Sequence, residues 1–432
     1  MQKCVIIGGG LAGLSAAVYL TKAGIRTELF EASPKLGGRA YSFTDPVTGD
    51  VIDNGQHIMM GCYTMTLEFL AAIGASDKLH IQPDLAVNFV KKNTGVVPLN
   101  ARFGPYPFNL LAGLLNYRAL GLKDKLGLIR LFSKLLFLNP ESLESLSVMD
   151  WLKREGQSRN AIKSFWEILA VGTLNTDLKQ ASAAMFADIL RQMFLHGRKM
   201  ASIIIPATGL SQMYCDDASA FISENGGCIH LSQQVKSVEI KHGKIRELKF
   251  EQREVTDFDS VICAVPPYAF SRIFPEEFTR QLNPDGFRYS SILSVHLWLS
   301  ENPFKERFYG LIDSPVQWLF NHDRFVTIVI SNADLLIEKE RSELLDIIFG
   351  ELEAYFSFFN RSLAVQSKII KEKRATFIPD YRMLHVRPAA VTSVKNLFLA
   401  GDWTNTGLPA TIEGAVKSGR TAAELVIRNN NN

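Results

Sequence analysis

Three glycines near the start of the chain have the spacing of a phosphate-binding turn: Gly8, Gly10 and Gly13 form the pattern G-x-G-x-x-G. The first glycine of such a turn permits the tight bend, the second lets the backbone approach a pyrophosphate, and the third lets a helix pack closely on a strand. The helix that follows this turn offers free N–H groups and the positive end of its dipole to phosphates. Leu11 and Ala12, within the turn, are expected to contact the nucleotide with the glycines. The spacing therefore predicts a nucleotide phosphate site.

A strand–helix–strand unit has to position this turn. The apolar run at 3–7 predicts a buried strand, residues 14–24 predict a helix, and residues 26–30 predict a second strand. Glu31 ends that second strand, 18 residues after Gly13, where its carboxylate can accept hydrogen bonds from a ribose. This order predicts a parallel strand pair with a right-handed crossover and a bound dinucleotide.

The residues after Glu31 distinguish FAD from NAD. They read Ala32-Ser33-Pro34-Lys35-Leu36-Gly37-Gly38-Arg39, which resembles the E-A-x-x-x-x-G-G-R pattern of the flavin amine oxidase and phytoene desaturase superfamily. The resemblance implies FAD, with this segment close to its pyrophosphate. It also implies that the FAD is not covalently linked, because the covalent members use a cysteine near the flavin and residues 402–412 contain none.

The C-terminal part of the chain carries a second block of this resemblance. Residues 399–403 end a predicted strand, and residues 410–416 open a predicted closing helix. In the superfamily the Asp of the G-D pair contacts the pyrophosphate and ribityl region, and the helix N-terminus points at the flavin pyrimidine ring, where it stabilises the negative charge of reduced flavin. The FAD contacts implied here and beside two intervening strands are Gly401, Asp402, Thr411, Ile412, Glu413, Ala415, Val235, Ala264 and Pro266.

A third block narrows the resemblance within the superfamily. Residues 53–63 resemble the D/E-x-G-x-H-x-x-x-G-x-Y motif of the plant-type phytoene desaturases and their bacterial relatives. This motif adds Asn54, Gly55, Gln56 and His57 to the implied FAD contacts. Together with residues 174–183, 373–377 and above all 401–420, it resembles the hydroxysqualene dehydroxylases, also called squalene-associated FAD-dependent desaturases, over nearly the whole chain.

Amine oxidases are a poorer match than these isoprenoid enzymes. The predicted strand at 291–299 lacks the lysine that amine oxidases place near the flavin, and residues 407–412 lack their aromatic side chains. A charged amine substrate is therefore disfavoured.

The resemblance implies reductive chemistry on a C30 isoprenoid alcohol. Loss of the allylic hydroxyl of hydroxysqualene gives a cation, hydride from reduced FAD converts it to squalene, and an unidentified reductant recharges the FAD. Two alternatives stay open. One is a phytoene- or carotenoid-type desaturase, in which hydride flows in the opposite direction, and the other is a non-enzymatic isoprenoid-binding FAD protein.

Two histidines are the candidates for catalytic side chains. His57, with Gln56 beside it, is expected near the flavin, although a purely structural hydrogen bond would explain a histidine there equally well. His296, on the predicted strand at 291–299, is the other candidate, and simple packing on a sheet face is its alternative explanation.

The order of the predicted elements indicates an α/β fold with a Rossmann-like, discontinuous FAD-binding domain and an inserted α+β substrate domain. We assign residues 1–85, 205–285 and 390–432 to the FAD-binding domain. The substrate domain takes a helical cap at 86–204 and a mixed sheet at 286–389.

Composition excludes several classes of protein. The 432 residues are 47% hydrophobic and 21% charged with a formal net charge of +3, which fits a globular chain and not a nucleic-acid-binding protein. Five scattered cysteines, an odd number with no C-x-x-C pair, argue against a disulfide framework or a metal site and favour a reducing cytoplasm. No apolar run reaches the ~18 residues that a membrane span needs.

Charge is nevertheless concentrated in one segment. Between residues 86 and 140, eight Lys or Arg face a single acid, Asp124, and residues 106–138 are mostly apolar. Lys123, Gly127, Arg130 and Lys134 recur at helical spacing and predict a narrow polar stripe on an apolar helix. A pair of core helices is one interpretation; we favour a peripheral contact with the anionic inner face of the cytoplasmic membrane.

Overall fold

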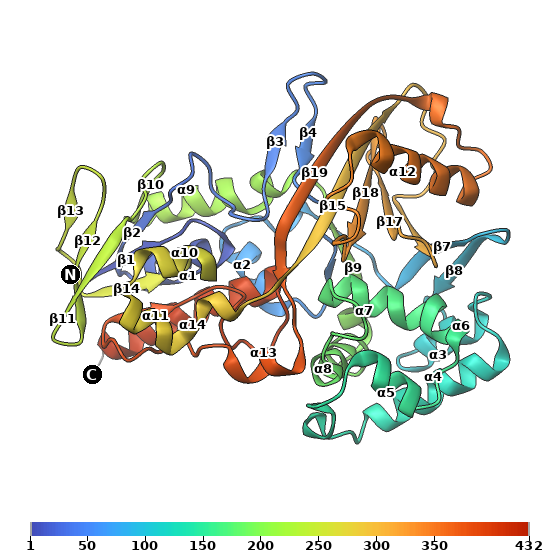
Figure 1. The fold of residues 1–432 in the computed structure, drawn as a ribbon, viewed down its shortest axis with the longest axis horizontal. Helices are drawn as coiled ribbons and strands as arrows, with labels where there is room; N and C mark the ends of the chain where they lie inside the picture. The colour runs from blue at the N-terminus through green and yellow to red at the C-terminus, as the bar shows by residue number, and fades with distance from the viewer. Residues whose placement is uncertain (1, 431–432) are drawn as a thin grey trace.

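The computed structural model describes residues 2–430, which fold into two lobes (Figure 1). One lobe is built on a five-stranded sheet and holds both ends of the described chain. The other combines a seven-stranded sheet with a group of helices (Figure 1).

The five-stranded sheet is parallel throughout and brings four loops to one edge. Its strands are β10 (Cys228–His230), β2 (Arg26–Phe30), β1 (Lys3–Ile7), β14 (Ser260–Cys263) and β20 (Leu397–Leu399), in that order. β1 and β14 are buried along their whole length, as expected for strands covered on both faces. Because parallel strands end at the same edge, the residues after β1, β2, β14 and β20 converge there.

Two helices that are distant in sequence cover this sheet together. α1 (Leu11–Lys22) packs against α14 (Ile412–Asn430) so closely that a Cβ on Gly419 would lie 2.0 Å from the carbonyl oxygen of Ala12. The Ser15 hydroxyl donates a hydrogen bond to the Val416 carbonyl at 2.8 Å. This contact fixes the start of α1 relative to the C-terminal helix.

The seven-stranded sheet has an outer face, on which α12 packs, and an inner face, which is turned toward the first lobe. Leu293, Val295 and Leu297 of its strand β15 pack in one apolar core with Leu344 and Ile348 of α12 (Arg341–Tyr355). Residues 290, 292, 294, 296 and 298 therefore lie on the opposite face. The strands, in sheet order, are β19 (Ala364–Phe377), β15 (Tyr289–Leu299), β18 (Phe325–Ser331), β17 (Trp318–Asn321), β16 (Phe308–Ile312), β7 (Ala86–Lys91) and β8 (Gly95–Asn100).

A group of helices lies beside this sheet and has its own apolar core. Trp151, Trp166 and Phe186 are buried in it and meet edge to face, with ring centroids 6.4 Å apart in both pairs that include Phe186. The helices are α3 (Phe108–Asn116), α4 (Leu122–Leu135), α5 (Val148–Arg154), α6 (Arg159–Ala161), α7 (Glu167–Leu174) and α8 (Ala183–Phe194).

The remaining elements are short. They form a hairpin of β3 (Ser42–Thr44) and β4 (Val51–Asp53), a sheet of β5 (Met59–Met60), β9 (Ile203–Pro206) and β6 (Leu79–Ile81), and a sheet of β11 (Ser237–Lys241), β12 (Lys244–Lys249) and β13 (Glu254–Val255). The other helices are α2 (Thr64–Ala72), α9 (Asp216–Glu224), α10 (Pro267–Ile273), α11 (Glu276–Leu282) and α13 (Tyr381–Val386).

The predicted α/β fold class is confirmed, with differences in detail. The first helix begins at Leu11, three residues before the predicted start, because the glycine turn itself leads directly into it. β7 and β8 lie within residues 86–204, predicted as a helical cap, but they join the seven-stranded sheet through parallel pairing of β7 with β16. No helix within residues 2–430 is long and apolar enough to cross a membrane.

Candidate active site

The glycine turn after β1 has the geometry that its sequence requires. Gly8 has a φ of +109°, which side-chain-bearing residues rarely adopt. A Cβ on Gly13 would lie 1.9 Å from the Gly8 carbonyl oxygen, so only glycine lets α1 pack this close to the turn.

A second glycine segment lies directly against the first. The Gly37 amide donates to the Gly9 carbonyl at 3.0 Å, and a Cβ on Gly38 would lie 3.2 Å from the Gly10 Cα. At Gly10, where α1 begins, no described side chain caps the helix. The first-turn N–H groups, those of Leu11 and Ala12 among them, can therefore bind an anion in the cradle between the two segments.

Glu31 lies at the edge of this cradle. Its carboxylate accepts hydrogen bonds from the Gly9 amide at 2.6 Å and the Ser33 amide at 2.8 Å, one on each oxygen. A carboxylate has about four acceptor positions, so both oxygens can still accept from ribose hydroxyls. The predicted acceptor is thus present and oriented by the turn.

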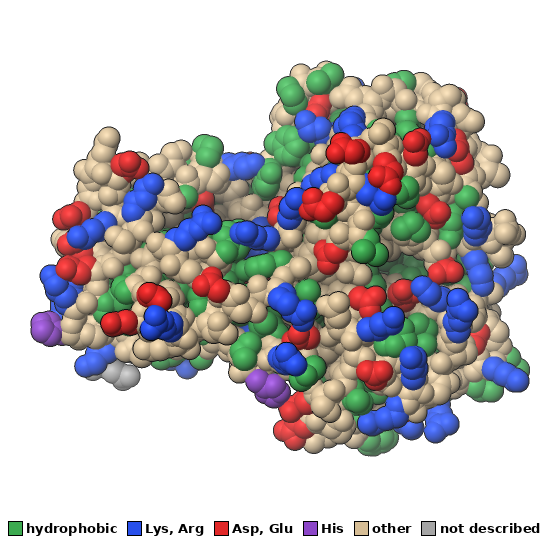
Figure 2. Space-filling view, viewed as in Figure 1, with side chains coloured by type: hydrophobic (Ala, Val, Ile, Leu, Met, Phe, Trp, Pro, Cys, Tyr) green, Lys and Arg blue, Asp and Glu red, His purple; other side chains and the backbone are tan. Residues whose placement is uncertain are grey.

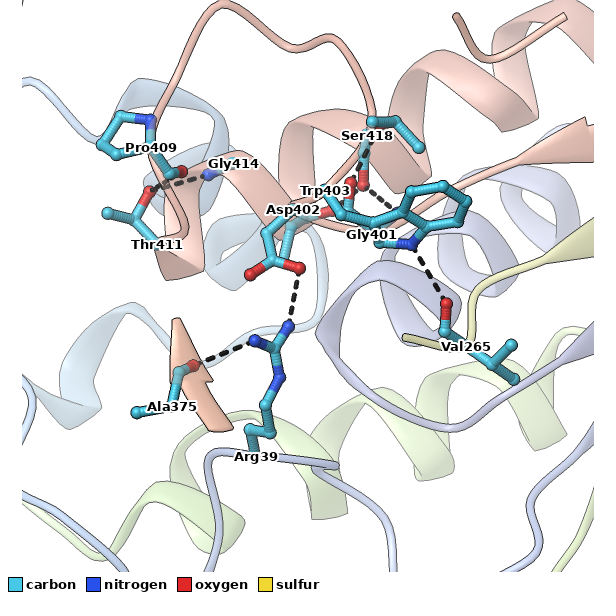
Figure 3. A network of polar contacts seen from close by, with 12 residues as sticks. Arg39, Val265, Ala375, Gly401, Asp402, Trp403, Pro409, Thr411, Gly414 and Ser418 are labelled. Carbon is cyan, nitrogen blue, oxygen red and sulfur yellow. Dashed lines mark hydrogen bonds and ion pairs between the residues drawn. The ribbon is translucent and has the colours of Figure 1, made fainter. Parts of the chain in front are cut away.

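An ion pair joins the N-terminal and C-terminal parts of the cradle (Figure 3). Arg39 Nη2 lies 2.6 Å from Asp402 Oδ1, and Arg39 Nη1 donates to the Ala375 carbonyl at 2.9 Å. Burial alone would lower the pKa of Arg39, but the adjacent Asp402 carboxylate more than offsets this and raises it. Arg39 therefore stays charged, which its predicted contact with the pyrophosphate requires.

The segment around Asp402 is held by its neighbours on both sides (Figure 3). The Gly401 amide donates to the Ser418 hydroxyl of α14 at 2.7 Å, and Trp403 Nε1 donates to the Val265 carbonyl at 3.0 Å. Val265 stands between Ala264 and Pro266, just beyond β14. These bonds bring the two predicted strand-end segments together.

Two predicted FAD contacts at the start of α14, Thr411 and Glu413, use their side chains for hydrogen bonds to the backbone. The Thr411 hydroxyl accepts from the Gly414 amide at 3.1 Å, and Ile412 begins the helix. The Glu413 carboxylate accepts from the amides of Met65 at 2.9 Å and Thr66 at 2.8 Å, at the N-terminus of α2. Glu413 can therefore contact a cofactor through its backbone, as Ala415 in the next turn can, while its side chain orients α2.

Four other predicted FAD contacts differ in their surroundings. The exposed Lys35 places its Nζ 3.1 Å from the centroid of the Tyr41 ring. Asn54 braces the arginine segment, since its Nδ2 donates to the Arg39 carbonyl at 2.8 Å. Val235 is buried beyond β10, in a core shared with Val5 and Phe30, and Ala32 is exposed.

The loop with Gln56 and His57 follows β4. His57 Nδ1 lies 2.7 Å from the Gly55 carbonyl, so Nδ1 carries the proton and Nε2 is an acceptor in the neutral ring. Burial lowers the pKa of His57, although the carboxylate of Asp53 opposes this. A neutral His57 can orient a polar group but has no proton to give from Nε2.

His296 lies on β15, on the face turned toward the first lobe. Its Nδ1 is 2.9 Å from the Thr327 hydroxyl, and burial together with the neighbouring His322 lowers its pKa to about 4. The two predicted catalytic histidines are thus both neutral near pH 7. They belong to two layers that face each other.

A small apolar cavity of ≈ 40 Å³ borders the start of α14. The sequence analysis missed two polar residues of this cavity, Thr173 of α7 and Gln192 of α8. Each lies among apolar neighbours in its helix and belongs to no recognised motif. The cavity is lined by Met60, Cys62, Tyr63, Thr173, Ile189, Gln192, Met193, Leu408, Pro409, Thr411 and Glu413. Its walls therefore come from both the predicted cofactor segments and the helical part.

The chain belongs to the family described as flavin containing amine oxidoreductase, whose model matches residues 11–427. It is accordingly an FAD-dependent oxidoreductase. The fold agrees: an engineered putrescine oxidase superposes with a TM-score of 0.75 at 18% identity, covering 99% of both chains.

The chain is similar to hydroxysqualene dehydroxylases over its full length. It is 31% identical to that of Rhodopseudomonas palustris and 29% identical to that of Zymomonas mobilis, over 99% of this chain and 99% of each relative. A 15-cis-phytoene desaturase of an Oncidium hybrid is 25% identical over 99% of this chain and 78% of its own length. The resemblance inferred from the motifs is confirmed.

Proposed function

We propose that the protein reductively removes the hydroxyl of hydroxysqualene to give squalene. The observation that carries this proposal is the similarity to hydroxysqualene dehydroxylases along practically the full length of both chains. The apolar cavity beside the start of α14 supports it, since a C30 hydrocarbon chain needs an apolar channel and Gln192 can hydrogen-bond a single hydroxyl there. The cavity is smaller than the substrate, so its lining has to move on binding.

The residues around the cradle would then have defined tasks. Bound FAD in its reduced form supplies the hydride. The N-terminus of α1 and Arg39 bind the pyrophosphate, Glu31 binds the ribose, and the N-terminus of α14 stabilises negative charge on the flavin. We assign these tasks to the discontinuous domain of residues 1–85, 205–285 and 390–432.

Product analysis tests the proposed function. The chain is co-expressed with the enzymes that make hydroxysqualene, and the extracted lipids are identified by gas chromatography. We expect squalene to replace hydroxysqualene. Desaturated products from phytoene instead would favour the desaturase alternative, and unchanged hydroxysqualene with a redox-inactive flavin would favour a binding protein.

Replacing Glu31 with Gln is expected to weaken FAD binding by roughly ten- to a hundred-fold. The amide keeps the shape but offers one acceptor oxygen, and hydrogen bonds to a charged group contribute about 1.5–3 kcal/mol. Fluorescence titration of the apoprotein with FAD measures the change. Glu251→Gln, at an exposed residue just after β12, is the matched control. An unchanged affinity in Glu31→Gln would remove Glu31 from the site.

We also propose that the protein works in the cytoplasm on the inner membrane face, through an apolar patch on the helical part. Figure 2 shows Lys and Arg side chains gathered over the lobe where α3 to α6 lie, with apolar side chains among them. The patch consists of exposed residues on α3 and α4 and beside them: Phe103, Phe108, Leu111, Leu115, Leu122, Leu126, Leu136 and Phe137.

Polar contacts join the segments that carry the patch. Lys125 Nζ donates to the Leu115 carbonyl at 2.6 Å, which joins α3 to α4. Arg198 donates to the carbonyls of Arg102 and Gly104, both at 3.0 Å, and so fixes the loop that exposes Phe103. An ordered surface that presents this many apolar side chains between cations fits an anionic lipid surface.

The polar stripe expected on α4 is divided between the neighbouring helices and the surface. Gly127 packs on Gln157, whose Nε2 donates to the Gly127 carbonyl at 3.0 Å, and Lys134 forms an ion pair with Glu155 at 2.5 Å. Lys123 and Arg130 are exposed. The large apolar side chains that α4 itself exposes are the leucines at 122 and 126.

Replacing Leu122 and Leu126 together with Gln is expected to reduce binding to anionic vesicles by roughly ten-fold or more, because each leucine side chain contributes about 1.5–3 kcal/mol when fully buried. Sedimentation with phosphatidylserine-containing vesicles measures it. Leu335→Gln, at a residue that is 90% exposed in the segment between β18 and α12, outside the patch, is the control. Equal sedimentation of wild type and double variant would assign the patch to another role.

A further inference from the structure

The loop that carries the histidine motif runs along the inner face of β15. A Cβ placed on Gly55 would lie 3.2 Å from the Ser294 hydroxyl oxygen. Two residues before Gly55, the backbone of Asp53 lies beside the ring of His296, two residues after Ser294, and this polar contact opposes the burial that lowers the pKa of His296. The loop and the strand are therefore paired layers, with polar side chains of β15 facing the backbone of residues 53–55.

Polar atoms in this layer are buried and unpaired. Ser294 and His296 are each 1% exposed, yet Ser294 Oγ and His296 Nε2 have no hydrogen-bond partner among the described residues. The Nε2 of His322 is also buried and has no hydrogen-bond partner among the described residues. An unsatisfied buried polar group costs about 1–3 kcal/mol, and ordered water is the usual partner where protein offers none.

His322, His296 and Ser294 lie in that spatial order from the outside of the lobe toward the loop of residues 53–55. His322 is only half-buried, and its ring stacks on Phe325 with centroids 4.6 Å apart. His296 meets the same Phe325 ring edge to face at 5.9 Å. Ser294 lies two residues before His296 on the same face of β15, next to Gly55. The charged groups nearest to His296 are Asp45 and Lys368, which pair with each other at 3.6 Å.

We propose that Ser294, His296 and His322 hold a file of ordered water molecules that brings protons from the surface to the loop of Gly55 and His57. The inference rests on the proposed function, because that reaction consumes a proton. The C–O bond breaks with its electron pair on oxygen, the hydroxyl takes up one proton and leaves as water, and hydride from reduced flavin forms the new C–H bond. The substrate carbon is reduced, the flavin is oxidised, and the proton has to enter an apolar site.

His57 itself does not meet this need. Its proton is held on Nδ1 against the Gly55 carbonyl, so Nε2 can only pass on a proton that reaches it. In a neutral His296, Nδ1 contacts the Thr327 hydroxyl, so Nε2 is the nitrogen that can exchange protons with water.

A high-resolution crystal structure of the FAD-bound protein tests the file without turnover. We expect ordered water within ~2.6–3.2 Å of both Ser294 Oγ and His296 Nε2. A dry contact between β15 and residues 53–55, with both atoms unpaired or bonded to protein, would overturn the proposal. Because this readout needs no substrate, it decides the file even if hydroxysqualene proves not to be the substrate.

Single-turnover kinetics with anaerobically reduced enzyme test the role of the file. We expect Ser294→Ala to slow flavin oxidation by hydroxysqualene roughly ten- to a hundred-fold and to change the solvent deuterium isotope effect, since positioned proton transfer contributes about 10²–10⁴-fold. Ser291→Ala is the matched control on the other face of β15, where it loses a bond to Asp334 and affects stability only. A wild-type rate and isotope effect in Ser294→Ala would overturn the role.

Discussion

Replacing Gly13 with alanine is expected to abolish FAD binding. The added Cβ would lie 1.9 Å from the Gly8 carbonyl oxygen, a backbone atom that cannot move without opening the turn. Overpacking of this kind costs about 1–3 kcal/mol or more, and here the distortion falls on the N–H groups that would bind the pyrophosphate. The variant should purify colourless, and titration of the apoprotein should give an FAD affinity reduced by a hundred-fold or more, on the order of that cost.

Gly350→Ala is the control for this prediction. Gly350 lies inside α12, and a Cβ there would meet no atom within 4 Å, so the substitution should leave FAD binding unchanged and stabilise the helix by roughly 0.5–1 kcal/mol. A yellow Gly13→Ala protein with wild-type affinity would contradict the assignment of the glycine turn.

Replacing Arg39 with alanine is expected to reduce both stability and FAD binding. Asp402, whose side chain is 7% exposed, would lose its ion-pair partner, and the pyrophosphate would lose a cation. A lost hydrogen bond to a charged group costs about 1.5–3 kcal/mol, so the free energy of unfolding of the apoprotein should fall by that amount and FAD affinity by roughly ten- to a hundred-fold. Urea unfolding and FAD titration measure the two effects separately.

Arg39→Lys separates the charge from the geometry. Lysine keeps the cation but cannot bond Asp402 and the Ala375 carbonyl at once, so it should recover part of the FAD affinity and little of the stability. If Arg39→Ala bound FAD like wild type while losing stability, the arginine would be a structural brace between the two ends of the chain and no cofactor ligand.

The part of the site that sequence predicts well is the part fixed by local backbone needs. The turn at Gly8 to Gly13 requires a positive φ and a close helix contact, and both requirements appear directly as glycine. β1 and β2 have the predicted bounds because each is a short strand that ends directly at a motif. Patterns of this kind can be recognised from a few consecutive residues without knowledge of the rest of the fold.

The features that sequence does not predict depend on distant partners. Glu413 lies within a cofactor motif, but its carboxylate caps α2, 347 residues away in sequence at Thr66. The orientation of α4 is set by Gln157 and Glu155, which no pattern within α4 reveals. The sequence does not predict β19, because its run of lysines with one glutamate and one arginine has the composition of a surface loop.

In the proposed reaction, hydride passes from the flavin of this protein to an isoprenoid alcohol. Anaerobic mixing of the fully reduced FAD-bound protein with hydroxysqualene tests this step, with the flavin absorption spectrum and the extracted lipid measured together. We expect the oxidised flavin spectrum to return, with squalene formed in equal amount to the flavin. A flavin that stays reduced with hydroxysqualene unchanged, while the oxidised protein is reduced by phytoene, would contradict it.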